Sequence, residues 1–72
     1  MSKLDQDKSY FLAFCIEQYK TAKGMDGGKV AHLFFENGVA SYLFNNFEVL
    51  HTQSYHWLVE EIDEYLERRD TE

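Results

Sequence analysis

The side chains that could do chemistry in this chain include one thiol. Cys15 is the only cysteine among the 72 residues, and it falls within the apolar run Tyr10–Ile16. Burial among aromatic side chains raises a thiol's pKa and lowers its reactivity. Nucleophilic catalysis also needs a base beside the nucleophile and a third group that orients the base. We therefore interpret Cys15 as a small core side chain and predict no catalytic residue and no enzyme activity.

Three histidines raise the question of a metal site. No two of His32, His51 and His56 have the i,i+4 spacing that places two imidazoles on one face of a helix. His56 and Glu60 do have this spacing, but two ligands do not complete a metal site. We predict no metal and no other cofactor, and we interpret His56 as a surface residue paired with Glu60.

The acidic residues are concentrated at one end of the chain. The net charge is −6; residues 1–47 carry five acidic and five basic residues, whereas 48–72 carry eight acids against Arg68 and Arg69. Phosphate contacts need clustered Lys and Arg, and the only local concentration is Lys20, Lys23 and Lys29. We therefore expect no nucleic acid as a partner. Acids along one straight helix do not converge on Ca²⁺ or Mg²⁺. The run is either a solvated face or a docking surface for a basic partner.

The segment Leu50–Gln53 combines a titratable residue with polar groups at the start of a helix. One interpretation is structural: Thr52 accepts hydrogen bonds from backbone N–H groups, and His51 bonds a carbonyl of another helix. The other interpretation is a binding role. The candidate partner-binding residues are His51, Thr52, Gln53, Trp57, Glu60, Glu61 and Glu64.

These side chains must be positioned by helices. The chain has no proline, and apolar residues recur at three- and four-residue spacing. We predict an all-α fold, a compact single domain of four short helices at about 5–23, 27–37, 39–46 and 54–69. Gly24 ends the first helix, Asp26 caps the second, and Asn37-Gly38 reverses the chain. Residues 47–53 could form a final turn, an extended connector or a short strand.

The apolar spacing also predicts which side chains face inward. The expected inward positions are Phe11, Leu12, Cys15, Ile16, Tyr19, Ala22, Val30, Leu33, Phe34, Val39, Tyr42, Leu43, Phe47, Tyr55, Leu58, Val59, Ile62, Tyr65 and Leu66. Either Thr52 or Ser54 is expected to cap the last helix. We expect 1–4 and 70–72 to be loose tails of the single domain 1–72.

Size and composition set the remaining expectations. A chain this short supports one small core, and domains below about 70–80 residues often need a disulfide, a metal or oligomerisation. A homodimer is therefore a candidate state. The first residues lack the apolar stretch of a signal peptide, and no segment has the 18 or more apolar residues of a membrane span. We expect a cytoplasmic protein with no membrane partner.

Several segments, in this order, resemble a small family, Domain of Unknown Function 3791. They are Phe14-Cys15-Ile16-Glu17-Gln18-Tyr19-Lys20, Leu33-Phe34, Asn37-Gly38-Val39, Tyr42-Leu43, Leu50-His51-Thr52-Gln53 and Leu58-Val59-Glu60-Glu61-Ile62-Asp63-Glu64-Tyr65. The resemblance implies a bacterial, intracellular, helical protein, often encoded beside or fused to a family that resembles ADP-ribosyltransferases. It carries over no catalytic residue. Gly28 and Tyr55-His56-Trp57 depart from the family pattern.

Together these observations predict a non-catalytic protein-interaction module. The pairing implied by the resemblance suggests an antitoxin-like partner of an ADP-ribosyltransferase-like protein. The alternative is a DNA-binding regulator in which the second and third helices form a helix-turn-helix around Asn37-Gly38. The charge of the chain disfavours that alternative.

Overall fold

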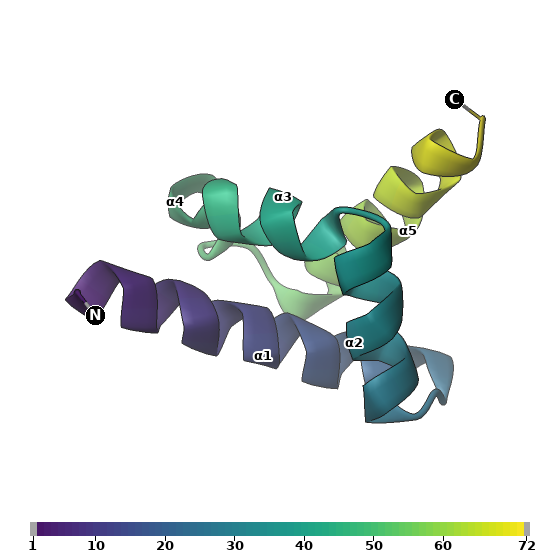
Figure 1. Cartoon of the computed structure of the whole chain (residues 1–72), viewed down its shortest axis with the longest axis horizontal. Helices are drawn as coiled ribbons and strands as arrows, with labels where there is room; N and C mark the ends of the chain where they lie inside the picture. Colours follow the sequence, from purple (N-terminus) through teal and green to yellow (C-terminus); the bar gives the residue numbers. More distant parts are fainter. Residues whose placement is uncertain (1, 72) are drawn as a thin grey trace.

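The computed structural model describes residues 2–71, which form five helices and no strand (Figure 1). The helices are α1 (Lys3–Lys23), α2 (Gly27–Glu36), α3 (Val39–Asn45), α4 (Phe47–Leu50) and α5 (Tyr55–Thr71). The predicted all-α class is confirmed. Four of the five correspond to the predicted helices, and α4 is an additional single turn.

Both ends of the chain are more ordered than predicted. The first helix begins at Lys3 because Ser2 caps it, its Oγ accepting a hydrogen bond from the Asp5 backbone N–H at 3.1 Å. A start at Asp5 and a loose tail over 1–4 were therefore wrong for the described residues 2–4. At the other end α5 continues through Thr71, beyond the predicted end at Arg69. Met1 and Glu72, the outermost residues of the predicted tails, lie outside the described residues.

The turn between α1 and α2 follows the predicted signals. Gly24 adopts the left-handed conformation (φ 63°), and its N–H donates to the Lys20 carbonyl, which ends α1. Two residues later the Asp26 carboxylate accepts from the Lys29 N–H at 3.2 Å and starts α2. The chain reverses within three residues, so α2 packs against the helix that precedes it.

The segment after α3 forms a helical turn, which is one of the three possibilities that the sequence left open for residues 47–53. The Asn46 side-chain amide donates to the Tyr42 carbonyl at 2.8 Å and closes α3 one residue before its predicted end at 46. The chain then forms the single turn α4, and Leu50 points from this turn into the core. Burial of that leucine gives the short segment a fixed place against α3.

The core is built around one stripe of α1. Phe11, Cys15 and Tyr19 are buried, and α1 contacts α2, α3 and α5 (Figure 1). The Tyr19 ring packs edge-on against Phe34 of α2 at a centroid distance of 5.4 Å, and Phe11 packs against Phe47 of α4 at 5.6 Å. The other buried side chains are Val30, Val39, Ala40, Leu43, Leu50, Leu58 and Ile62.

Most predicted inward positions are buried or half-buried, but two are not. Ala22 and Tyr55 are exposed, and Tyr55 retains 47% of its accessible surface. Ala22 lies near the end of α1 and Tyr55 at the start of α5, and both line an open groove between these helices. Periodicity gives a side chain's direction but not the length of the partner element.

A hydrogen bond and an ion pair to Asp63 join the first and last helices. The Tyr19 hydroxyl donates to Asp63 Oδ1 at 2.7 Å, and Lys23 Nζ lies 2.5 Å from Asp63 Oδ2. Burial, the hydrogen bond to Asp63 and the negative charge of that carboxylate together hold the pKa of Tyr19 well above its usual range. The carboxylate thus fixes α5 against the C-terminal end of α1.

Two glycines give a matched test of the backbone. Gly38 has φ 78°, and a Cβ there would lie 3.2 Å from the Tyr65 hydroxyl, whereas a Cβ on Gly27 would meet Lys20 Cδ at an ordinary 3.4 Å. We expect Gly38→Ala to lower the free energy of unfolding by about 1–2 kcal/mol, because an L residue is strained in the left-handed region. Gly27→Ala should leave it unchanged or raise it by up to about 1 kcal/mol. Urea denaturation measures both, and equal losses would contradict the assignment of strain to Gly38.

Candidate interaction surface

The first turn of α5 positions the candidate partner-binding residues of that helix. Ser54 Oγ accepts a hydrogen bond from the Trp57 N–H at 3.2 Å, which confirms the second of the two predicted caps. Counting from Trp57, residues three, four and seven positions later share one side of the helix. Those positions are Glu60, Glu61 and Glu64.

These four side chains line a small hollow on the outer side of α5, here called the acidic hollow. Its volume is about 60 Å³, and Trp57, Glu60, Glu61 and Glu64 form its walls. The Trp57 side of the hollow is open to solvent, since this residue retains 39% of its accessible surface. An aromatic face beside carboxylates attracts cationic groups such as Lys or Arg side chains.

The glutamates of the acidic hollow have different environments. Glu61 is the least exposed, with 16% of its side chain accessible, and it pairs with Arg68 Nη2 at 3.5 Å. The pKa of Tyr42 is raised first by burial and second by the negative charge of Glu61. The Glu61 carboxylate therefore lies beside α3. Glu60 and Glu64 are exposed on the outside of the helix. Glu61 is therefore engaged within the chain, and the other two present their charge to solvent.

A larger groove, here called the α1–α5 groove, adjoins the acidic hollow. It has a volume of about 290 Å³ and runs between the C-terminal half of α1 and the start of α5. Glu60 lines both the groove and the hollow, so they form one continuous surface. The lining residues are Gln18, Thr21, Ala22, Tyr55, His56, Val59 and Glu60. This surface combines apolar side chains with an acidic edge, and sequence periodicity missed it because Ala22 and Tyr55 were expected in the core.

The other three candidate residues, His51, Thr52 and Gln53, lie in the connection between α4 and α5. Here His51 Nδ1 lies 2.7 Å from the Phe47 carbonyl oxygen, and its ring stacks on the Phe47 ring at 4.3 Å. The Thr52 hydroxyl donates to the Val49 carbonyl at 3.1 Å, and the Gln53 N–H donates to the Leu50 carbonyl at 3.1 Å.

The prediction for His51 is confirmed, since this residue bonds a carbonyl of a helix other than α5, whereas the prediction for Thr52 was wrong. The carbonyl that His51 bonds belongs to α4, the helix directly before it, and Thr52 donates to a carbonyl, whereas the prediction had its side chain accepting from N–H groups. The Thr52 bond satisfies a carbonyl near the C-terminal end of α4, whereas the Phe47 carbonyl accepts from both the backbone N–H and the ring of His51. The side chains of both residues are exposed, so their outer faces remain available to a partner.

The groups considered for chemistry do not gather into one site. Within residues 2–71, no three His, Cys, Asp or Glu side chains are grouped closely enough to hold a metal ion. His32 pairs with Glu36 of its own helix at 3.2 Å, and the ring of His56 lies 4.0 Å from the ring of Tyr55. Cys15 is 1% exposed and belongs to the core, whereas His51 lies on the surface.

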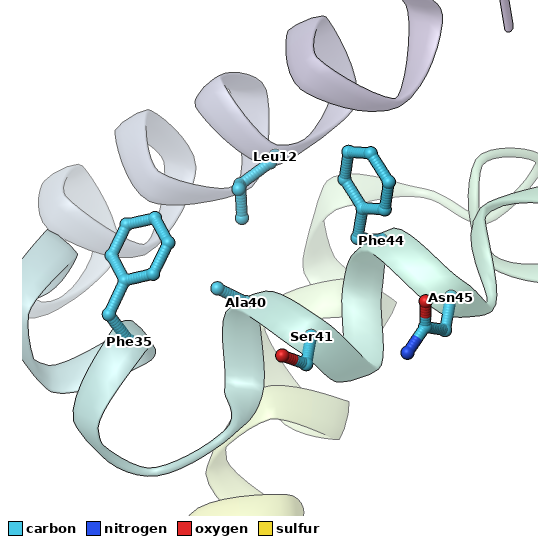
Figure 2. Close-up of a pocket in the computed structure, with 6 residues that line it drawn as sticks. All are labelled: Leu12, Phe35, Ala40, Ser41, Phe44 and Asn45. Carbon is cyan, nitrogen blue, oxygen red and sulfur yellow. The ribbon is translucent and has the colours of Figure 1, made fainter. Parts of the chain in front are cut away.

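A third hollow, here called the apolar groove, lies between α1, α2 and α3 (Figure 2). It has a volume of about 260 Å³ and is lined by Leu12, Phe35, Ala40, Ser41, Phe44 and Asn45. Phe35 is 65% exposed at its edge. Nothing in the sequence indicated this groove, because Phe35 and Phe44 lie off the helical stripes that predict the core.

Comparison with known proteins identifies the family. A family model described as a protein of unknown function, DUF3791, matches residues 10–69. The chain belongs to the DUF3791 family. This match confirms the resemblance drawn from the segments between Phe14 and Tyr65. No curated protein and no solved structure matches this DUF3791 chain.

Over the described residues, no helix of this DUF3791 protein is both long enough and apolar enough to cross a bilayer.

The buried thiol predicts a pH dependence of stability. Burial raises the pKa of Cys15 from 9.0 to about 12. Because the pKa of this thiol is higher in the folded than in the unfolded state, the neutral thiol stabilises the fold. This stabilisation is fully present below pH 9 and is lost as the pH rises toward 12. The first part of this window reports mainly on Cys15, because the ordinary pKa of Tyr19 and Tyr42, which are also raised, is 10.0.

We therefore expect the free energy of unfolding to fall between pH 9 and 10, and Cys15→Ala to flatten that fall. The variant itself costs about 1 kcal/mol for the small cavity. Urea denaturation at each pH provides the measurement, and Tyr19→Phe serves as the control because it should alter mainly the fall above pH 10. A thiol reagent should label Cys15 only after unfolding; rapid labelling of the native protein at pH 7 would contradict the assigned burial.

Proposed function

We propose that this DUF3791 protein is a non-catalytic protein-interaction module that binds a basic partner protein through the acidic hollow and the α1–α5 groove. Together we call these two features the α5 surface. The observation that carries the proposal is the juxtaposition of exposed Trp57 with Glu60 and Glu64 beside a groove with apolar walls.

Charge supports a basic partner. Between Val30 and Glu67 the chain has no Lys or Arg, so nothing of opposite sign lies on α5 until its last turn. Glu60 and Glu64 project from this helix into solvent. A one-signed face of this kind speeds encounter with an oppositely charged surface and selects against acidic competitors. The acids therefore contribute association rate and specificity.

Apolar contacts supply affinity. Tryptophan and tyrosine are enriched among the few residues that dominate binding energy at interfaces. Trp57 lines the acidic hollow, and Tyr55 lines the adjoining groove, both partly exposed in the free protein. A partner that covers this surface excludes water from both rings and gains hydrophobic stabilisation. His51, Thr52 and Gln53 are exposed in the connection that leads into α5, so a partner that reaches past the start of this helix would meet them.

The family context suggests which partner to test first. The resemblance implies that DUF3791 chains are encoded next to, or fused with, ADP-ribosyltransferase-like proteins in bacteria. A basic nucleotide-binding cleft on such a protein matches the charge of the α5 surface. On this proposal the chain is the cytoplasmic antitoxin that covers that cleft.

The first experiment is co-expression with the adjacent gene product. We expect the two proteins to copurify and the DUF3791 chain to relieve any growth defect caused by its neighbour. The double variant Glu60→Lys/Glu64→Lys should weaken binding at least tenfold, with Trp57→Ala giving a comparable loss, measured by isothermal titration calorimetry. Glu36→Lys with Glu17→Lys is the matched control, because it changes the same charge at exposed positions of α1 and α2.

Two results would contradict the proposal. One is a neighbour that is harmless alone and never copurifies. The other is a complex that the control pair weakens as much as the α5 pair does, because such binding would depend on net charge and not on the α5 surface.

The helix-turn-helix alternative makes a different prediction. Here α3 would be the recognition helix, and its exposed positions Ser41 and Asn45 are uncharged. Phosphate contacts from Lys and Arg supply most non-specific DNA affinity. We therefore expect the purified protein to pass through a DNA column even at low salt. Retention that falls steeply with added salt would revive the DNA-binding function.

A further inference from the structure

A second surface of the protein fits a second copy of the chain. We propose that the apolar groove between α1, α2 and α3 is a two-fold dimer interface, in which Phe35 of each copy enters the groove of the other. This interface is separate from the α5 surface, since no residue lines both the apolar groove and either feature of that surface.

The shape of the apolar groove suits a projecting ring. In Figure 2, Phe35 and Phe44 stand at its two ends, with Leu12 on the α1 side and the small side chain of Ala40 between them. Phe35 is 65% exposed in the single chain, whereas Ala40 beneath the groove is 4% exposed. Each copy therefore presents both a projecting aromatic ring and a hollow with a small residue at its base.

Two-fold symmetry uses both features at once. In an isologous contact, residue i of one copy meets residue j of the other, and j meets i in return. When one Phe35 enters the opposing groove, the second Phe35 enters the first groove by the same rotation. Both hollows are then filled and no copy of the groove is left open, so the assembly closes at two chains.

The distribution of charge selects a second copy as the occupant. Identical chains repel through any strongly charged face. The eight acids of residues 48–72 make the α5 side unsuitable for self-contact, whereas residues 1–47, which build α1, α2 and α3, are balanced at five acids and five bases. None of the six residues that line the apolar groove is charged. A cation, Lys8, lies beside it, with its Nζ 5.1 Å from the centre of the Phe44 ring.

The size of the domain favours such an interface. A 72-residue chain with one buried cysteine has no internal disulfide to stabilise its small core. Burying Phe35 and the groove walls between two copies removes apolar surface from water without adding like-charge repulsion. The dimer would leave the two α5 surfaces outside the contact, so it would carry two sites for the partner of the proposed function.

Sedimentation velocity across a concentration series tests the dimer. We expect the purified protein to shift from one to two chains as concentration rises, and Phe35→Glu to remain a monomer at every concentration. Tyr10→Glu is the matched control: it places the same charge at a 75% exposed aromatic of α1 that does not line the groove. It should dimerise normally. Phe35→Leu, which keeps an apolar side chain, should retain dimerisation with at most a tenfold weaker dissociation constant.

Two outcomes would overturn the dimer. One is a protein that stays monomeric up to about 1 mM, which would leave the groove for a different protein. The other is a dimer that survives Phe35→Glu but is lost with Tyr10→Glu. Circular dichroism and urea denaturation of each variant must match the parent, so that loss of folding is not mistaken for loss of assembly. Glu60→Lys/Glu64→Lys should dimerise at least as well as the parent, which makes failure of the proposed function distinguishable from failure of the dimer.

Discussion

Phe11, Cys15 and Tyr19 form the stripe of α1 on which the rest of the structure depends. All four later helices contact this helix, so the one stripe must satisfy partners that come from all later parts of the chain. The aromatic rings supply apolar area, and Cys15 between them in the sequence is 1% exposed. Because the interior is filled by these contacts, burial keeps the thiol protonated and unreactive.

The same stripe carries the polar connection described between α1 and α5. Tyr19 and Lys23 both bind Asp63, so this one acid of α5 faces α1 and is neutralised there. This polar contact adds to the apolar contacts that Leu58 and Ile62 of α5 make in the core. Burying the carboxylates of α5 in the core would cost free energy, whereas on the outside of the helix they can attract a partner.

The molecule separates two kinds of surface. The α5 surface is acidic and holds Trp57 at its centre, while the apolar groove beside Phe35 lies among helices of balanced charge. We propose that one binds a basic protein and the other an identical chain; on these proposals, binding and self-association use different faces. His51 and Thr52 serve first to close α4 through local hydrogen bonds, and any contact they make with a partner adds to that role.

The sequence by itself determined the helices, most caps and most of the core, because these depend on neighbours three or four residues away. Gly24, Asp26 and Ser54 are local signals, and each acts as predicted. Only the tertiary structure decided that Ala22 and Tyr55 lie outside, that residues 47–50 form a helical turn, and that the α1–α5 and apolar grooves exist. These features depend on where each helix ends relative to its neighbour, and on which residues that are distant in the chain meet. Periodicity along one helix contains no information about either.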